Sequence, residues 1–487
     1  MWSGRFREPL NSAFESWQAS FRFDVRLLNN EVVASKAHAK TIAASGILTP
    51  DELVTMLEGL DRVPYAAVEE ARTLVDLNGL GEAYQAPRPN TGLVMSSMPF
   101  ISMLNPHAED IHHFVELQLT KLIGDLALKL HTGRSRNEQI ATDMRLFVRD
   151  SIDHTVEGLR EWILALTEVA TSAGEAVIPS YTHLQRAEPV LVAHWLLAYV
   201  SMIERDISRL LDARKRMNLC PLGSGAVAGA TLALDRTIAA KELGFDGPTP
   251  NSMDATSDRD FMLEFTQCLA TLGIHISRFA EELTLYSTAE FGFLDLPEAF
   301  STGSSAMPQK KNPDLTELIR GKSARLIGAS ISLSVLMKGL PLAYNKDLQE
   351  GQEPVFDAAD TIAGILSVLP AFTRSLKFNF GRMKTAATTG YLNAMAAATY
   401  LSNKGVPFRK AHEIIGNAVR LGLESGRELN DLKLEELQRL SEAFAADFFN
   451  AITLEATMDC HDVVGGTARA RVASALAAAK KNLEENK

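Results

Sequence analysis

The sequence predicts an all-α protein whose body is a bundle of long helices. Proline breaks helix interiors, so long stretches without it leave room for long helices. Four such stretches lie between residues 106 and 179, 189 and 221, 250 and 297, and 313 and 341. In the first of them, apolar residues with the spacing of one buried helical face recur at Ile152, Val156, Leu159, Ile163, Leu166 and Ala170. We find no alternating apolar runs joined by Asn-Gly or Asp-Gly turns, the pattern that predicts hairpins.

Three segments of the chain differ in the helices they predict. The first hundred residues predict shorter helices with breaks, notably at residues 87–92. The middle carries the long helices, including one around residues 195–219 that is apolar at its start and then rich in Arg and Glu. The last hundred residues are rich in Ala and Glu and predict shorter helices again. We therefore expect three domains, at residues 1–134, 135–384 and 385–487.

Composition and charge exclude several classes of protein. The chain has 487 residues and a formal net charge of -11, and this acid excess argues against nucleic-acid binding, which needs a basic surface. Its three cysteines are far apart and form no CxxC pair, which disfavours a disulfide framework or a zinc knuckle. The N-terminus shows no apolar signal segment, and the run VLVAHWLLAYV is too short to span a bilayer. We expect a soluble, cytoplasmic protein with no membrane partner.

A metal site is conceivable where two histidines follow a predicted helix start. In NPHAED, residues 105–110, Asn105 can cap a helix and Pro106 suits its first turn. Glu109 and His113 are four residues apart, but the adjacent histidines point to different helix faces and the HExxH pattern is missing. We therefore predict no metal.

Three polar segments that interrupt the helices could each carry chemistry. HTGRSRNEQ, residues 131–139, is either a solvated helix junction or a carboxylate-binding corner, because arginine's planar fork suits carboxylates. PSYTHLQRAEP, residues 179–189, predicts a proline-bracketed loop whose His183 is either a surface residue or a proton-transfer group. PLGSGAVAG, residues 221–229, has GxGxxxG spacing after a helix, which predicts a tight helix–helix turn with close backbone approach rather than a dinucleotide site.

The segment STGSSAMPQKKNPD, residues 301–314, predicts a mobile loop with exposed backbone N–H groups. Its two lysines would favour a bound anion, and Glu317 lies in the helix that follows. A second polar cluster, YNKDLQEGQE, occupies residues 344–353. In a long-helix bundle these polar segments could meet at one corner, including from different subunits, and surround an anion.

Several of these motifs resemble a known family. GSSAMPQKKNP resembles the GSSxMPxKxN signature of the fumarase/aspartase superfamily. HTGRSRN, YTHLQRAEP, NSMDATSDRDF and YNKDLQE are similar to stretches of the argininosuccinate lyase family, as are WSGRF and FESWQASFRFD near the N-terminus. The likeness runs from Trp2 through the last helices, and the sequence MPQKKNPD favours argininosuccinate lyases over their relatives.

The resemblance implies both an assembly and a reaction. It implies a homotetramer of three-domain, all-α subunits with a twenty-helix core, in which three subunits build each active site. The implied reaction is reversible cleavage of argininosuccinate to arginine and fumarate without metal or organic cofactor, the last step of arginine biosynthesis. A doubly charged aci-carboxylate intermediate would need fixed donors and cations, which the loop could supply.

The family match also implies roles for individual residues. It makes Ser304 the catalytic serine, His183 its partner, Glu317 the residue that orients His183, and Lys310 a charge-stabilising cation. We expect Ser304 to be the base and His183 the acid, and the opposite direction stays open. The substrate-binding positions carried over are Ser20, Asp110, Arg136, Asn137, Thr182, Ser305, Asn312, Tyr344, Gln349 and Gln352.

Two positions depart from the family pattern. Glu138 stands where Asp is usual, and Gln352 stands where many members have a Lys that binds a substrate carboxylate. Gln352 can donate a hydrogen bond but supplies no charge. The alternatives are therefore a sister lyase acting on adenylosuccinate or aspartate, and a non-catalytic, crystallin-like scaffold. The intact Ser304, His183 and Lys310 count against the scaffold.

Overall fold

The computed structural model describes residues 7–77, 101 and 108–485. The predictions that concern residues 2–6, residues 87–92, Asn105 and Pro106 fall outside the described residues. The chain divides into two compact units, and each is described by itself. Unit 1 comprises Met1–His154, Arg209–Ala270 and Arg325–Thr361, and unit 2 comprises Thr155–Ser208, Thr271–Ala324 and Ile362–Lys487.

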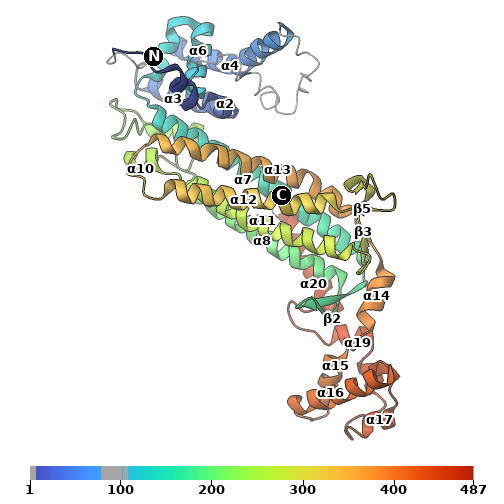
Figure 1. The fold of residues 1–487 in the computed structure, drawn as a ribbon. Helices are drawn as coiled ribbons and strands as arrows, with labels where there is room; N and C mark the ends of the chain where they lie inside the picture. Colours follow the sequence, from blue (N-terminus) through green and yellow to red (C-terminus); the bar gives the residue numbers. More distant parts are fainter. Residues whose placement is uncertain (1–6, 78–100, 102–107, 486–487) are drawn as a thin grey trace. The chain divides into compact units, whose positions relative to one another are not determined.

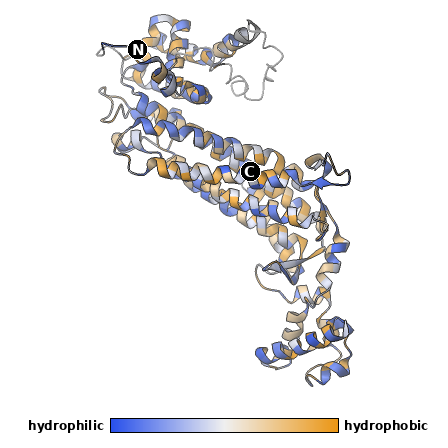
Figure 2. Ribbon diagram, viewed as in Figure 1, coloured by the Kyte–Doolittle hydropathy of each residue, from blue (hydrophilic) through white to orange (hydrophobic). Residues whose placement is uncertain are grey.

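The prediction of an all-α protein with long helices is confirmed. Five long helices, each contributing residues to both units, are α7 (Arg136–Ala173), α8 (Val192–Met217), α11 (Asp260–Tyr286), α12 (Asp314–Met337) and α13 (Gln352–Arg374) (Figure 1). The six apolar positions of α7 that predict one helical face, from Ile152 to Ala170, are all buried. Apolar and polar residues are interspersed along these helices (Figure 2), because one face of each packs inward. The division into three domains stays a prediction.

In unit 1, α3 packs against α4, α6 and α9. The shorter helices and 3₁₀ segments of this unit, together with α3 and α4, are α1 (Ser12–Gln18), α2 (Phe21–Asp24), η1 (Val25–Leu27), α3 (Leu28–Ala44), α4 (Pro50–Leu77), α6 (Ile111–Ile123), η3 (Gly124–His131), α9 (Arg236–Glu242), α10 (Ser252–Ser257) and η5 (Lys346–Gly351). The prediction of shorter helices in the first hundred residues is wrong for α4, which has 28 residues and is longer than α8 with its 26. Phe21 of α2 stacks on Phe114 of α6 with ring centroids 4.7 Å apart. This contact joins the short helix α2 to the start of α6, where the polar residues described below gather.

The side chain of Arg26 joins the N-terminal helices of unit 1 to the long helices of the same unit. The Arg26 guanidinium lies 4.7 Å from the ring centre of Phe356 and 5.5 Å from that of Phe147. Its two terminal nitrogens donate to Asp360 at 3.0 and 2.7 Å. Such a bidentate, ring-stacked arginine fixes orientation as well as contributing energy.

In unit 2, buried aromatic side chains with satisfied polar atoms hold the long helices together. Trp162 of α7 is fully buried, donates Nε1–H to Thr373 Oγ1 at 3.1 Å, and meets the Phe279 ring edge-on. Glu282 accepts from both the Trp195 Nε1–H and the Tyr199 hydroxyl at 2.6 Å. A buried Trp or Tyr needs such a partner for its polar atom.

The C-terminal part of unit 2 consists of short helices with their own core. They are α14 (Phe380–Thr388), α15 (Ala394–Asn403), α16 (Phe408–Ser425), η6 (Leu429–Asp431), α17 (Leu434–Gln438), α18 (Phe448–Ala451), α19 (Leu454–Asp459) and α20 (Arg469–Glu485). Tyr400, Phe444 and Phe448 pack edge to face in this core. The prediction of shorter helices after the long ones is therefore confirmed.

Strands form a hairpin that the sequence does not predict. The described residues contain three two-stranded antiparallel sheets, which pair β1 (Val177–Thr182) with β2 (Gln185–Leu191), β3 (Leu294–Asp295) with β6 (Lys377–Phe378), and β4 (Thr302–Gly303) with β5 (Lys311–Asn312). The β1–β2 hairpin occupies PSYTHLQRAEP, so the prediction of a loop there is wrong. Unit 2 also contains the short segment η4 (Glu298–Phe300).

One helical stretch, Lys346–Arg374, is long and apolar enough to cross a membrane by length and composition alone. In the fold, 56% of its most apolar window is buried against the rest of the protein. That burial is typical of a core helix, and α13 begins with the buried Gln352 and ends with Arg374, which pairs with Glu161 and Glu168.

Candidate active site

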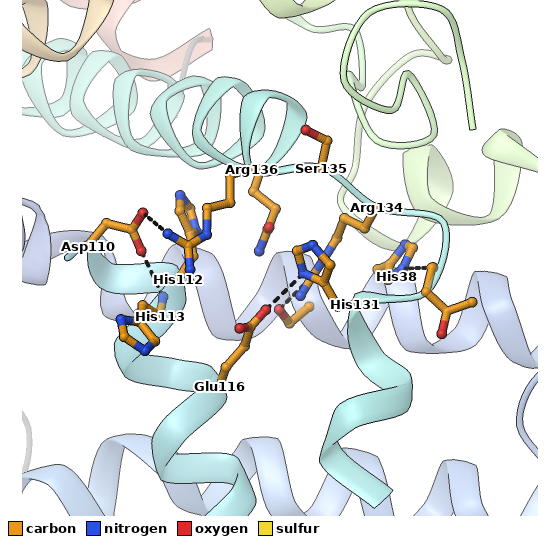
Figure 3. Close-up of polar contacts among 12 residues, drawn as sticks. His38, Asp110, His112, His113, Glu116, His131, Arg134, Ser135 and Arg136 are labelled. Atoms are coloured by element: carbon orange, nitrogen blue, oxygen red, sulfur yellow. Dashed lines mark hydrogen bonds and ion pairs between the residues drawn. The ribbon is translucent and has the colours of Figure 1, made fainter. Parts of the chain in front are cut away.

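In unit 1, Asp110 and Arg136 form an ion pair between the starts of two helices. Asp110 is the N-cap of α6, and its Oδ1 accepts from the His113 N–H at 2.8 Å. The other oxygen, Oδ2, accepts from Arg136 Nη1 at 2.9 Å (Figure 3). Arg136 also donates to Glu109 at 3.3 Å. The cap of α6 thereby holds the guanidinium of a predicted substrate-binding residue in a fixed position.

The loop at residues 224–230 is tied to the start of α7 by Glu138. One Glu138 oxygen accepts from the Ser135 N–H at 3.1 Å, and the other accepts from the Gly225 N–H at 2.8 Å. Burial raises the pKa of Glu138, although these backbone donors favour its ionised form. Asn137 donates to the Ala226 carbonyl at 3.1 Å. The carboxylate, one methylene longer than the usual Asp, therefore anchors this loop beside two predicted binding residues.

PLGSGAVAG is not the tight helix–helix turn that its spacing predicts. Residues 218–235 form a long connection with several turns between α8 and α9, and Cys220 in it bridges to Pro248. The expected close backbone approach is confirmed, because a Cβ on Gly225 would lie 2.6 Å from the Gly229 carbonyl oxygen. Gly225 also has a φ of +62°, which favours glycine.

A hollow of about 670 Å³ lies beside this loop in unit 1. Its lining includes Glu109, His131, Ser135, Arg136 and residues 225–231. Arg134 also reaches it, but the Arg134 side chain is buried and donates to Ser35 Oγ at 2.8 Å. HTGRSRNEQ is thus a partly buried corner of a hollow rather than a solvated junction, and Arg136 and Asn137 are its half-buried donors.

Three further predicted binding residues lie near the same carboxylates. The Ser20 N–H donates to the Glu109 carbonyl at 2.8 Å, and Gln349 Nε2 donates to the Gln18 carbonyl at 3.1 Å. Burial raises the pKa of Tyr344, with Asp110 and Glu109 adding to the increase and Arg259 opposing it. Unit 1 therefore gathers Ser20, Asp110, Arg136 and Tyr344 around Glu109, with Gln349 bonded to Gln18, two residues before Ser20.

Gln352 begins α13 as a buried amide. Its side-chain Oε1 has no hydrogen-bond partner among the residues that the structure describes. The residue before it, Gly351, is packed so tightly that an added Cβ would lie 3.1 Å from both Leu333 and Met262. An uncharged side chain suits this apolar surrounding better than an unpaired lysine would.

A buried network behind α6, rather than the Glu109–His113 pair, offers metal-type ligands. Glu31, His112 and Asp143 place ligand atoms within 4.8 Å of one another, whereas Glu109 meets His113 only through its backbone N–H at 3.4 Å. His112 Nδ1 lies 2.7 Å from Glu31 Oε2, and Arg134 lies 3.8 Å from Glu31. A guanidinium beside the cluster disfavours a cation there.

The charges in this network favour a proton over a metal ion. Burial opposes a charge on His112, but the nearby Glu31 outweighs it and raises the pKa of His112. Burial likewise opposes ionisation of Glu31, yet His112 and Arg134 lower its pKa. Burial and the adjacent Glu31 raise the pKa of Asp143 well above its usual range. These shifts favour a protonated His112 beside an ionised Glu31 and a neutral Asp143.

In unit 2, His183 occupies the tip of the β1–β2 hairpin. Thr182 pairs with Gln185, which leaves His183 and Leu184 as a two-residue turn with φ of 55° and 56°. Positive φ at both central residues is the type I′ geometry, which Asn-Gly usually supplies. Neither residue carries that signal, which explains why the sequence does not predict the hairpin. The turn presents His183 as an exposed side chain.

The predicted catalytic loop is a second small hairpin of unit 2. Thr302 pairs with Asn312 and Gly303 with Lys311, so the two ends of the loop lie together. Ser304 Oγ accepts from the N–H groups of Ala306 and Met307 at 3.2 and 3.1 Å. This hydroxyl therefore lies in a turn of backbone donors.

The cations of this loop are held at its base. Lys310 Nζ donates to Asn312 Oδ1. Lys311 instead donates to Asp295 at 2.5 Å and to the Leu296 carbonyl at 2.8 Å, which ties the loop to the preceding segment. Ser305 is exposed beside Ser304.

The structure does not bring the predicted Ser304, His183 and Glu317 together within unit 2. Glu317 lies in the first turn of α12, half exposed, with Arg320 at 3.8 Å. Among the described residues of this unit, no hydrogen bond or ion pair connects His183 with Ser304 or Glu317. Each of the three is instead presented on an exposed or half-buried surface of its own element.

Sequence reasoning missed Asp24, Glu31 and Asp143. All three are buried carboxyl groups on helices, where an acidic residue is ordinarily taken as part of a solvated face. Their positions among apolar neighbours, such as Asp143 next to Met144, were the available signal. That signal is weak because a single acidic residue interrupts helical faces in many proteins.

Comparisons with known proteins agree with this architecture. A lyase family model matches residues 100–328, and a model described as argininosuccinate lyase C-terminal matches residues 391–459. The argininosuccinate lyase of Acidobacterium capsulatum is 58% identical over 481 residues, which cover 99% of this chain and 94% of the relative. That of Koribacter versatilis is 53% identical over 483 residues, covering 99% and 97%.

Solved structures share the fold at lower identity. EDDS lyase in complex with formate gives a TM-score of 0.76 at 24% identity, covering 98% of this chain and 93% of that one. The 3-carboxy-cis,cis-muconate lactonizing enzyme from Pseudomonas putida gives 0.70 at 18% identity, covering 97% and 99%. These likenesses concern the fold alone.

The lyase family model and the full-length relatives together define a lyase of the fumarase/aspartase superfamily. Within that class, the chain belongs to the argininosuccinate lyase family, because full-length relatives share more than half of its residues.

Proposed function

We propose that the protein is a carbon–nitrogen lyase that cleaves argininosuccinate reversibly to arginine and fumarate, the last step of arginine biosynthesis. The observation that carries the proposal is the Ser304 turn, whose hydroxyl oxygen accepts two backbone N–H groups. Donors aimed at an oxygen stabilise its anionic form, so this turn favours the serine alkoxide that a base needs. The full-length relatives supply the substrate class.

The reaction can be followed by its protons. Ser304 removes the proton on the carbon beside a substrate carboxylate, and the electron pair left behind spreads into that carboxylate. Lys310, Asn312 and the loop N–H groups stabilise this doubly charged form, because they are fixed donors and cations. The C–N bond then breaks, and His183 gives a proton to the departing guanidinium nitrogen. The reverse assignment, with His183 as base, is decided by an experiment described below.

The binding residues would hold the two ends of the substrate. Arg136 and Asn137 at the start of α7, with Ser20 and Thr182, would contact the dicarboxylate portion. Tyr344, Gln349 and Gln352 would contact the arginine portion. Asp110 holds Arg136 in place through its 2.9 Å ion pair. Ser305, beside Ser304 in the loop, would close over the substrate with it.

Assembly into a homotetramer would complete each site. Support comes from His183, Ser304 and Glu317, which lie on exposed or half-buried positions of separate elements and do not contact one another in unit 2. We propose that three subunits contribute to each site, that the long helices form a twenty-helix core, that no metal or organic cofactor is used, and that the enzyme works in the cytoplasm.

A substrate panel tests the function. Purified protein is incubated with argininosuccinate, adenylosuccinate and aspartate, and fumarate is followed by its ultraviolet absorbance. Fumarate from argininosuccinate alone is the expected result. The buried, uncharged Gln352 is the one observation that favours a sister lyase, so fumarate from adenylosuccinate or aspartate instead would replace the proposal with that alternative. A protein inactive on all three would favour the scaffold.

A further inference from the structure

A buried hydrogen bond links Ser20 to Asp24, a carboxyl group that none of the catalytic or binding assignments above includes. Ser20 is the N-cap of α2, and Asp24 is the last residue of that helix. Ser20 Oγ and Asp24 Oδ2 lie 2.6 Å apart, and both residues are buried. The Ser20 backbone is fixed by its N–H bond to the Glu109 carbonyl. The serine hydroxyl therefore has Asp24 as its close side-chain partner, and the Glu109 carbonyl oxygen lies farther away, at 3.5 Å.

The direction of this hydrogen bond depends on whether Asp24 carries a proton. An ionised carboxylate can only accept, so Ser20 must then donate its hydrogen to Asp24 and can offer a substrate only an acceptor. A protonated Asp24 can donate to Ser20 Oγ. The Ser20 hydrogen can then turn to another acceptor, either the Glu109 carbonyl oxygen at 3.5 Å or a substrate carboxylate. The two states thus give Ser20 opposite roles.

The surroundings of Asp24 bring its protonation into the neutral pH range. Burial, and then the nearby Asp110, raise the pKa of Asp24 to about 7, whereas the Ser20 hydroxyl, His112 and the Ile111 N–H lower it. Asp143 of α7 and Tyr344 also interact electrostatically with Asp24. Unit 1 already holds Glu109 and Asp110 at this position, so a dicarboxylate substrate would add further negative charge. That addition favours a neutral Asp24 still more.

We propose that Asp24 is a positioning residue that donates its carboxyl proton to Ser20 Oγ, so that the Ser20 hydroxyl donates its own hydrogen to a substrate carboxylate. The inference rests on the proposed function, because Ser20 must face the dicarboxylate portion of the substrate. Asp24 itself touches no substrate. No proton is gained or lost in the arrangement, since each group donates the hydrogen it already carries.

The test compares the wild type with Asp24→Asn, whose amide can donate to Ser20 at every pH. KM and kcat for argininosuccinate are measured from pH 6 to pH 8. With a pKa of about 7, the protonated fraction of wild-type Asp24 falls about tenfold between pH 6 and pH 8. The ratio of wild-type KM to Asp24→Asn KM should therefore rise up to tenfold over this range, with kcat changing less. Asp51→Asn, an exposed position on α4, is the matched control and should follow the wild type.

A flat or falling ratio would overturn the proposal, because Ser20 would then not depend on a proton at Asp24. Should Asp24→Asn fail to fold, Ser20→Ala gives the same information: its KM should exceed that of the wild type at pH 6 and approach it at pH 8. An equal excess at both pH values would likewise overturn the proposal. A wild type that releases no fumarate from argininosuccinate would reject the proposed function and, with it, this inference.

Discussion

The hydroxyl oxygen of Ser304 lies 3.1 Å from the backbone nitrogen of Met307, whose N–H points at it. With the Ala306 N–H at 3.2 Å, this gives the serine two fixed donors before any substrate binds. A serine is a weak base unless its anion is stabilised, and a turn of this kind is one way to stabilise it. The turn also explains the small residues of the loop, since bulky side chains would hinder approach to these N–H groups.

Ser304→Ala should lower kcat by about a hundredfold to ten-thousandfold, the range expected for loss of a proton-transfer group. KM should change much less, because the lost interaction belongs to the transition state. Steady-state kinetics with argininosuccinate would measure both. Ser334→Ala, an exposed serine on α12, is the control and should retain wild-type activity. A Ser304→Ala protein that folds and turns over normally would contradict the assignment.

Isotope exchange distinguishes the base from the acid. In deuterated water, His183→Asn should still exchange the hydrogen beside the substrate carboxylate while releasing little arginine, because carbanion formation needs only the base. Ser304→Ala should lose the exchange. Nuclear magnetic resonance of recovered argininosuccinate would measure it. Exchange kept by Ser304→Ala and lost by His183→Asn would reverse the two roles.

Asp143→Asn should make the protein more stable relative to the wild type as the pH rises. The folded-state pKa of Asp143 is raised. Its protonated carboxyl group therefore contributes fully to the free energy of unfolding below the unfolded-state pKa, and this contribution is lost as the pH rises through the folded-state pKa. In that window the wild type loses about 1.4 kcal/mol per pH unit from this group, and asparagine has no proton to lose. Thermal unfolding at pH 5 and pH 8 would compare them. A variant that is less stable relative to the wild type at pH 8 than at pH 5 would show that Asp143 is ionised.

Glu138→Gln should loosen the loop at residues 224–230. In glutamine an NH₂ donor replaces one of the two carboxylate oxygens that accept from Ser135 and Gly225, so one N–H loses its acceptor, which should cost about 1–3 kcal/mol. Hydrogen exchange of the Gly225 amide would report the change as faster exchange. Glu157→Gln, on the exposed side of α7, is the control. Unchanged protection of Gly225 would mean that other contacts hold the loop.

The helices of this fold could be predicted from the sequence, but its turns and buried charges could not. The buried face of α7 follows directly from apolar spacing between Ile152 and Ala170, because local periodicity determines which side of a helix is covered. The His183 hairpin could not be predicted, since its turn residues, His183 and Leu184, adopt positive φ without being the Gly, Asn or Asp that signal it. The Glu31–His112–Asp143 network joins helices far apart in the chain, and no local pattern reveals such a meeting.

Resemblance names the candidate site residue by residue, and the roles of these residues stay predictions. The loop around Ser304 and the Arg136–Asn137 pair stand where the motifs indicate, and the structure adds what holds them: Asp110 for Arg136, and the backbone of Met307 for Ser304. The role of Gln352 cannot be read from the sequence, because its effect depends on a substrate that the motif alone does not specify.

The most direct test of the central claim is the release of products from argininosuccinate by the purified protein. Fumarate and arginine are quantified in the same reaction, the first by absorbance and the second by chromatography. The account predicts that both appear in equal amounts and that the reverse reaction regenerates argininosuccinate. Fumarate without arginine, or neither product from argininosuccinate under conditions where adenylosuccinate or aspartate is cleaved, would contradict it.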